Sequence, residues 1–98
     1  MICVKVYRQG RDTLVAACDC DIVGKTFRGN GLKIEVSPGF YKGDTGDEEL
    51  LVNRLGMATV GNLVGKETMA IAVKHGFVDP DNILQIGGVP HAQFARMM

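Results

Sequence analysis

The stretch "IGGVPHAQF", residues 86–94, carries the side chains best suited to chemistry. Histidines in general exchange a proton near neutral pH, so His91 is a candidate acid or base, and Gln93 adds an amide donor and acceptor. In an extended chain these two side chains share one face. Gly87 and Gly88 could bring backbone amides close to a ligand. The competing interpretation is structural: the glycines turn the chain and His91 satisfies a buried backbone group.

A third polar group for such a site is Asn62, which lies among glycines in a segment with helical spacing. The ligand-binding candidates are therefore Asn62, Gly87, Gly88, His91 and Gln93. No Ser-His-Asp or Cys-His set is recognisable from local spacing, so no catalytic residue is assigned beyond the candidate His91. A small enzyme or ligand-binding protein using residues 87–93 is one alternative, and a non-enzymatic protein is the expectation.

The segment "VGKT", residues 23–26, resembles the end of a phosphate-binding loop. Such a loop needs an earlier glycine whose backbone wraps the phosphates, and Asp19 occupies that position. An acidic side chain there repels phosphate, so Lys25 is read as a solvated lysine beside a turn glycine. Asp19 and Asp21 are read as solvated carboxylates at a strand end, with divalent cation binding as the alternative.

The three cysteines are an odd number, which argues against a disulfide scaffold and favours a reducing compartment. If Val4 shares a face with Leu14 in an antiparallel pair, Cys18 and Cys20 lie on that face and Cys3 lies on the other. We therefore expect that the three thiols do not converge on one metal.

A zinc site could be assembled on paper from Cys18, Cys20 and either His75 or His91. Structural zinc sites normally have paired ligand spacings in both halves, and this chain has only one Cys-x-Cys. Core thiols are the preferred interpretation, and we expect no metal and no cofactor. His75 is expected at a helix end, where a cation interacts favourably with free carbonyl groups.

The composition is that of an ordinary globular chain: 98 residues, 46% hydrophobic and 22% charged. This length predicts a single domain over residues 1–98. No apolar run is long enough to cross a bilayer, and the start lacks the apolar core of a secretion signal, so we expect a cytoplasmic protein without a membrane partner.

Charge is unevenly distributed although the net charge is zero. Residues 1–42 carry seven basic and four acidic side chains, whereas residues 43–82 carry three basic and seven acidic ones. The front part could therefore contact RNA or a ribonucleoprotein, because clustered Lys and Arg supply most non-specific affinity for phosphates. The contact candidates are Lys5, Arg8, Arg11, Lys25, Arg28 and Lys33. The small number of aromatic residues argues against an extensive stacking surface.

Periodicity predicts strands over residues 2–8 and 13–19, a turn at Gly29-Asn30-Gly31, and a strand over residues 32–36. The capping-box spacing of Thr45 and Glu48 predicts a helix start, and helical spacing then continues to Asn62 or Leu63.

Gly65 is expected to end this first helix, and Gly76 to end a second helix over residues 66–75. A short strand is expected at residues 83–86, and the tail from residue 91 is expected to be a strand, with a short helix as the alternative. The fold class is therefore α+β: a mostly antiparallel sheet with a two-helix hairpin on one face, in the order β-β-(β)-β-α-α-β-β.

The pieces "YRQGRDTLVAACD", "GKTFRGNGLKIEVSPGFYKG", "ATVGNLVGKETMAIAVKHGFV" and "GGVPHAQ" resemble an archaeal family known as domain of unknown function 424. The resemblance runs over nearly the whole chain, and "NLVG" and "GGVPHAQ" are its most specific parts. It implies an archaeal cytosolic source, and it supplies no catalytic residues.

Self-association is a further alternative, because an apolar helical surface or an unpaired strand edge could pair two copies as a homodimer. Five methionines, two of them at the C-terminus, could form an adaptable apolar contact. The sequence leaves the oligomeric state open.

Overall fold

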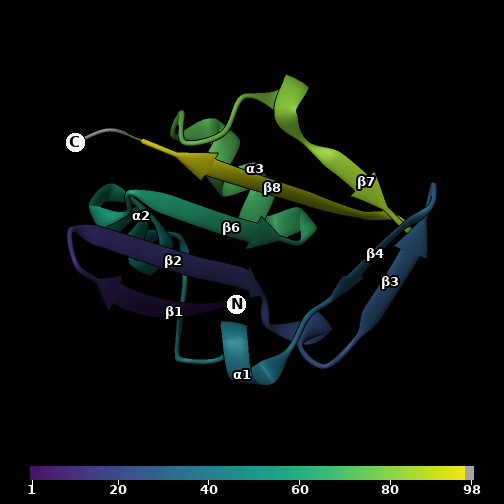
Figure 1. The fold of residues 1–98 in the computed structure, drawn as a ribbon, viewed down its shortest axis with the longest axis horizontal. Coiled ribbons are helices and arrows are strands. Elements are labelled where there is room, and N and C mark those ends of the chain that lie inside the picture. The colour runs from purple at the N-terminus through teal and green to yellow at the C-terminus, as the bar shows by residue number, and fades with distance from the viewer. Residues whose placement is uncertain (97–98) are drawn as a thin grey trace.

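The structure is a computed structural model, which describes residues 1–96 (Figure 1). Its α+β class confirms the fold class expected from the sequence. The strands are β1 (Ile2–Gln9), β2 (Asp12–Asp19), β3 (Thr26–Gly29), β4 (Leu32–Glu35), β5 (Asp44–Gly46), β6 (Val60–Val64), β7 (Leu84–Ile86) and β8 (Val89–Ala95). The helices are α1 (Pro38–Tyr41), α2 (Glu48–Met57) and α3 (Lys66–Lys74), with the 3-10 turns η1 (Cys20–Ile22) and η2 (Pro80–Asn82).

Six strands form one mixed sheet in the order β5-β1-β2-β6-β8-β7. The central pair, β2 and β6, is parallel, and the other neighbours are antiparallel. Strands β3 and β4 form a separate hairpin, whose tip approaches the β7–β8 turn in Figure 1. The two outer strands, β5 and β7, have only three residues each, so the sheet offers short edges.

Both faces of the sheet are covered, and each has its own apolar core. On one face, Leu51 and Leu55 of α2 and Met69 of α3 pack against strand residues such as Val4 and Val15. On the other face, Tyr41 of α1 and Phe27 and Ile34 of the hairpin pack over Cys3, Cys18 and Val64. We call these the helix face and the hairpin face. Among residues 1–96, no helix is long and apolar enough to cross a membrane.

The predicted register of β1 and β2 is wrong. The turn between them has two residues, so Gln9 pairs with Asp12. Each odd-numbered residue of β1 therefore faces an even-numbered residue of β2, whereas the sequence analysis had paired even with even. Cys3 therefore lies opposite Cys18 on the hairpin face, where the sequence had placed them on different faces. The sequence pattern was ambiguous because both faces of β2 are buried, so apolar residues occupy every position from Val15 to Cys18.

The helical hairpin expected from the sequence is interrupted by β6. Helix α2 ends at Met57, and the segment expected to continue it forms the central strand Val60–Val64. A strand buried on both faces has no polar alternation, so its apolar spacing is easily read as helical. Gly61 is required in this strand because a Cβ there would collide with the ring of Phe94.

The observed helix ends differ from two of the three predicted ones. Helix α2 is capped by Asp47, whose carboxylate accepts from the Glu49 amide at 3.1 Å, while Thr45 lies in β5. Gly65 begins α3 and does not end a helix. Gly76, with φ 78°, follows the end of α3 as predicted.

The strand expected for the tail is confirmed by β8. Residues 97–98, including both C-terminal methionines of the proposed self-association contact, lie outside the described residues.

Candidate functional site

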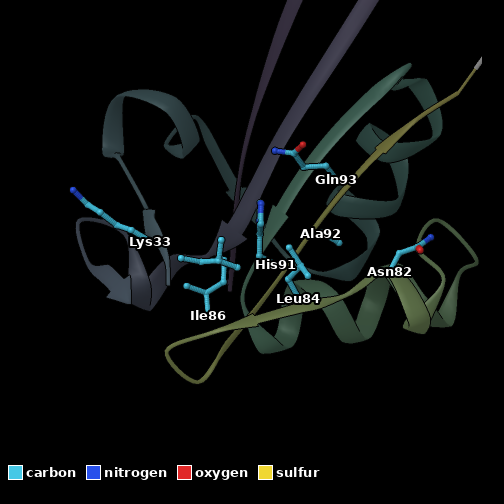
Figure 2. Close-up of a pocket in the computed structure, with 8 residues that line it drawn as sticks. Lys33, Asn82, Leu84, Ile86, His91, Ala92 and Gln93 are labelled. Carbon is cyan, nitrogen blue, oxygen red and sulfur yellow. The ribbon is translucent and has the colours of Figure 1, made fainter. Parts of the chain in front are cut away.

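A pocket of about 340 Å³ lies where the hairpin, β7 and β8 meet (Figure 2). Strand β4 contributes Lys33, and β8 contributes His91 and Gln93. The pocket therefore joins one of the RNA-contact candidates to two of the ligand-binding candidates. Its full lining is Leu32, Lys33, Asn82, Leu84, Ile86, His91, Ala92 and Gln93. The volume falls at the lower end of the range for small-molecule sites.

The hairpin is held against the β7–β8 turn by two glycines. A Cβ on Gly29 would lie 2.7 Å from the amide nitrogen of Gly87, and a Cβ on Gly87 would lie 2.7 Å from the carbonyl oxygen of Arg28. Gly87 and Gly88 also have φ values of 59° and 85°, as a tight hairpin turn of this kind requires. These glycines are outside the pocket lining, and they shape the pocket by allowing this close approach.

His91 is half-buried, and its Nδ1 lies 2.9 Å from the carbonyl oxygen of Leu63. A carbonyl oxygen only accepts, so Nδ1 carries a proton and donates it to this bond. In the neutral ring the other nitrogen, Nε2, is then an acceptor, and none of residues 1–96 hydrogen-bonds it. Figure 2 places His91 between Leu84 and Gln93. The backbone bond foreseen by the structural interpretation is therefore present, and the ring also lines the pocket.

Asn62 has a different environment from the one expected. It pairs with Gln93 across β6 and β8, but it is outside the pocket lining. Its Oδ1 accepts a 2.6 Å hydrogen bond from the hydroxyl of Tyr41, which fastens α1 to the hairpin face. Burial raises the pKa of the Tyr41 hydroxyl to about 12. Asn62 therefore positions α1, and the sequence had no signal for its partner.

Three of the six basic candidates gather at the hairpin. Arg28 and Lys33 are direct partners across β3 and β4, so both point outward on the same hairpin surface. Lys25 precedes β3 and is exposed. The only acidic residue within residues 25–35 is Glu35, which is paired with Thr26. Lys33 lines the pocket, and Figure 2 shows its side chain extending away from His91. We call Lys25, Arg28 and Lys33 the hairpin basic cluster.

The other three basic candidates are not part of this cluster. Arg8 and Arg11 lie at the β1–β2 turn, which Figure 1 places at the opposite end of the sheet from the hairpin. Lys5 is half-buried, and its Nζ donates to the carbonyl oxygen of Gly39 at 2.8 Å. The single basic surface suggested by the sequence is therefore divided.

The three cysteines lie in one core cluster on the hairpin face, whereas the sequence analysis had placed Cys3 on the opposite face from the other two. Cys3 and Cys18 are cross-strand partners, and the sulfur atoms of Cys3 and Cys20 are 2.7 Å apart. All three are free cysteines. Burial raises the pKa of Cys18 to about 12 and, together with the contact to Cys3, that of Cys20 to about 11. Within the described part of the chain, no group of three or more His, Cys, Asp or Glu residues is arranged to hold a metal ion.

Asp19 has a structural role that the sequence did not reveal. Its carboxylate accepts from the amides of Glu67 and Thr68 at 3.1 and 2.8 Å, and from the buried Thr68 hydroxyl at 2.7 Å. It therefore caps the start of α3 from a neighbouring strand, in place of Gly65, which has no side chain to do so.

His75 ends α3 as expected. Its Nε2 lies 2.6 Å from the carboxylate of Glu48 at the start of α2. This bond, followed by the one from Lys74, lowers the pKa of Glu48. The interaction links the two helices and is remote from the pocket.

Of the eight lining residues, the sequence candidates include only Lys33, His91 and Gln93. Leu32, Asn82, Leu84 and Ile86 come from the hairpin, η2 and β7. Leu32 and Leu84 remain 45% and 52% exposed. Their convergence depends on the glycine contact between Gly29 and Gly87, which no local pattern predicts.

Comparisons with known proteins give the following matches. A family model described as "Protein of unknown function (DUF424)" matches residues 7–97. No curated protein sequence matches the chain. A solved structure of an uncharacterized conserved protein from Methanopyrus kandleri has a TM-score of 0.81 and 21% sequence identity, covering 99% of this chain and 94% of that one. This similarity supports the same fold.

Proposed function

Since the chain belongs to the DUF424 family of unknown function, we propose from its site alone that it is a non-enzymatic module that binds single-stranded RNA through the hairpin. The observation that carries this proposal is the position of Lys33. Its charge belongs to the hairpin basic cluster, and the residue also lines the pocket that contains His91 and Gln93. Phosphates would lie along the cluster, and one base would enter the pocket.

Within the cluster, Arg28 and Lys33 suit a phosphate backbone because their charges are exposed and adjacent across the hairpin. Arg28 and Lys33 are neighbours across the hairpin, and neither has an acidic partner within 4 Å among residues 1–96. Charges that are not already paired can neutralise phosphates and release counterions, which favours binding.

The pocket suits an unstacked base because it combines apolar and polar surfaces. Leu32 and Leu84 offer apolar side chains against which a flat ring can pack. Asn82 and Gln93 are exposed amides, which can donate to and accept from the edge of a base. In single-stranded RNA a base can unstack and present its Watson–Crick edge to such a pocket, whereas in a duplex that edge is paired.

Fluorescence anisotropy with a labelled 12-nucleotide single-stranded RNA of mixed sequence tests the proposal at low salt. The variant Arg28→Glu with Lys33→Glu should lose at least about tenfold in affinity. The matched control is Arg8→Glu with Arg11→Glu, which makes the same change in net charge at the other end of the sheet. The proposal would be contradicted if the wild-type protein did not bind the RNA, or if the two double variants lost the same affinity.

Small-molecule binding is a second candidate, favoured by the geometry of His91. The bond from Nδ1 to Leu63 fixes the ring, and the other nitrogen is left as an acceptor in the neutral state. Thermal-shift measurements with uridine and with uridine monophosphate would test this candidate, because a ligand that binds only the folded state raises Tm. A shift with either compound that is lost in His91→Ala supports it, and no shift at millimolar concentration opposes it.

Self-association stays a prediction. The exposed Leu84 lies on the edge strand β7, so a second copy could cover it. Sedimentation equilibrium of the wild type and of Leu84→Lys would decide the matter by mass.

A further inference from the structure

We infer that Cys3 and Cys20 form a reversible intramolecular disulfide when the protein meets a low-molecular-weight disulfide oxidant. This modification site is separate from the pocket and does not depend on the proposed RNA binding. The carrying observation is the 2.7 Å approach of the two sulfur atoms, which is closer than non-bonded sulfur atoms normally come. A disulfide bond needs about 2.05 Å, so only a small adjustment separates the dithiol from the bonded form.

The backbone already holds these two cysteines in place. Cys3 lies in β1, paired with β2, and the amide of Cys20 donates to the carbonyl oxygen of Met1 at 2.9 Å. Turn η1 is therefore attached to the start of β1 by a main-chain hydrogen bond as well as by the contact between the two sulfur atoms. The pair is therefore held by a strand ladder and a main-chain hydrogen bond.

The three cysteines differ in solvent exposure, and this difference decides which thiol reacts first. Cys20 is half-buried, whereas Cys3 is 3% exposed and Cys18 is fully buried. An external disulfide can therefore reach only Cys20 directly. Its raised pKa makes the thiolate scarce at neutral pH, so the first step is slow without being blocked.

The Cys20 thiolate attacks one sulfur of the small disulfide, forming a mixed disulfide and releasing one small thiolate. The Cys3 thiolate then attacks the Cys20 sulfur, forming the Cys3–Cys20 bond and releasing the second small thiolate. The two protons of the protein thiols end on the released small thiols. The protein is oxidised by two electrons, and the small disulfide is reduced by the same two electrons.

Cys18 is expected to take no part. It faces Cys3 across the strands, but its sulfur is enclosed by the hairpin core, and the short sulfur contact of Cys3 is made with Cys20. The resulting bond joins residues separated by 17 positions and connects β1 to the turn that leads into the hairpin.

The test is oxidation of the full chain with oxidised glutathione, followed by alkylation, unfolding and digestion without reduction. A protease that cleaves before aspartate separates the three cysteines, because Asp12, Asp19 and Asp21 divide the fragments. We expect the fragment of residues 1–11 to be linked to residues 19–20, while Cys18 is found alkylated. The oxidised protein should have the monomer mass and a Tm raised by roughly 10 °C, reversed by dithiothreitol.

Two variants keep the result interpretable. Cys18→Ala should still form the bond, and Cys20→Ala should retain both remaining thiols under the same treatment. Cys20 is the better position to change because it is less buried than Cys3, so folding is preserved. Retention of all three thiols, a link from Cys3 to Cys18, or a disulfide between two chains would overturn the inference.

Discussion

Gly29 and Gly87 lie backbone against backbone where the hairpin meets the β7–β8 turn, with a Cβ on the first falling 2.7 Å from the amide nitrogen of the second. This contact brings Leu32 and Lys33 next to His91 and Gln93, which are about sixty residues away in the sequence. The pocket, and its position beside the hairpin basic cluster, therefore depend on one close approach of two main chains.

Replacing Gly87 tests this dependence. Gly87→Ala should lower the free energy of unfolding by about 3 kcal/mol, because it combines a positive φ with a collision against the carbonyl oxygen of Arg28. Gly88→Ala is the matched control: its φ is also positive, but a Cβ there meets nothing within 4 Å. Gly88→Ala should lower the free energy of unfolding, measured in urea, by about 1–2 kcal/mol. Equal losses would show that the close contact contributes nothing.

Asp19 should matter for stability although its neighbour Asp21 should not. Asp19→Ala removes three hydrogen bonds at the start of α3 and leaves the Thr68 hydroxyl buried without this acceptor. We expect a loss of about 2 kcal/mol in the free energy of unfolding. Asp21 is exposed, so Asp21→Ala should change it by less than about 0.5 kcal/mol. A near-neutral Asp19→Ala would contradict the capping role.

Tyr41 should make the protein sensitive to alkaline pH. Burial raises its folded-state pKa from 10.0 to about 12, so the unfolded chain loses this proton first. The stabilising contribution is complete below about pH 10 and is lost as the pH rises toward 12. Tyr41→Phe removes this part of the pH dependence between pH 10 and 12.

At neutral pH the same variant should be about 1 kcal/mol less stable, because Asn62 loses its donor. Urea unfolding at pH 8, 10 and 11 measures both effects. Cys18 and Cys20 also have raised pKa values in this range, so the comparison uses the difference between the two proteins at each pH. An unchanged difference from pH 8 to 11 would refute the assignment to Tyr41.

The pocket and the cluster should contribute to RNA binding in different ways. Gln93→Ala removes an uncharged contact, so affinity should fall about threefold to tenfold while its salt dependence is unchanged. Lys33→Gln removes a phosphate contact and should reduce the slope of log K against log salt by roughly 0.7. Anisotropy titrations from 50 to 200 mM salt separate the two. Identical salt dependence in both variants would argue against this division of roles.

The α+β class and several strands were predictable because β1, β2 and β4 have recognisable apolar patterns and turn residues. Strand β6 was not predictable, because a strand buried on both faces has the same apolar content as a buried helix segment. The register of β1 and β2 was missed for a related reason: with both faces buried, only the two-residue turn at Gly10 and Arg11 decides which side Cys3 takes.

For the site, the sequence identified His91, Gln93 and Lys33, because their types are chemically suited to binding. It could not find Leu84 or Asn82, whose relevance arises only when the hairpin folds onto β7. It also grouped Arg8 with Arg28 by position in the chain, whereas the sheet separates them. Long-range packing decided each of these points, and local spacing carries no information about it.

The most direct test of the account is to map RNA contact on the protein by amide chemical shifts. Adding the 12-nucleotide single-stranded RNA to isotope-labelled protein at low salt should shift the amides of residues 25–35 together with those of Asn82, His91 and Gln93. Amides at the β1–β2 turn should change little, although Arg8 and Arg11 are also basic and exposed. Shifts concentrated at that turn, or none at millimolar RNA, would contradict binding through the hairpin.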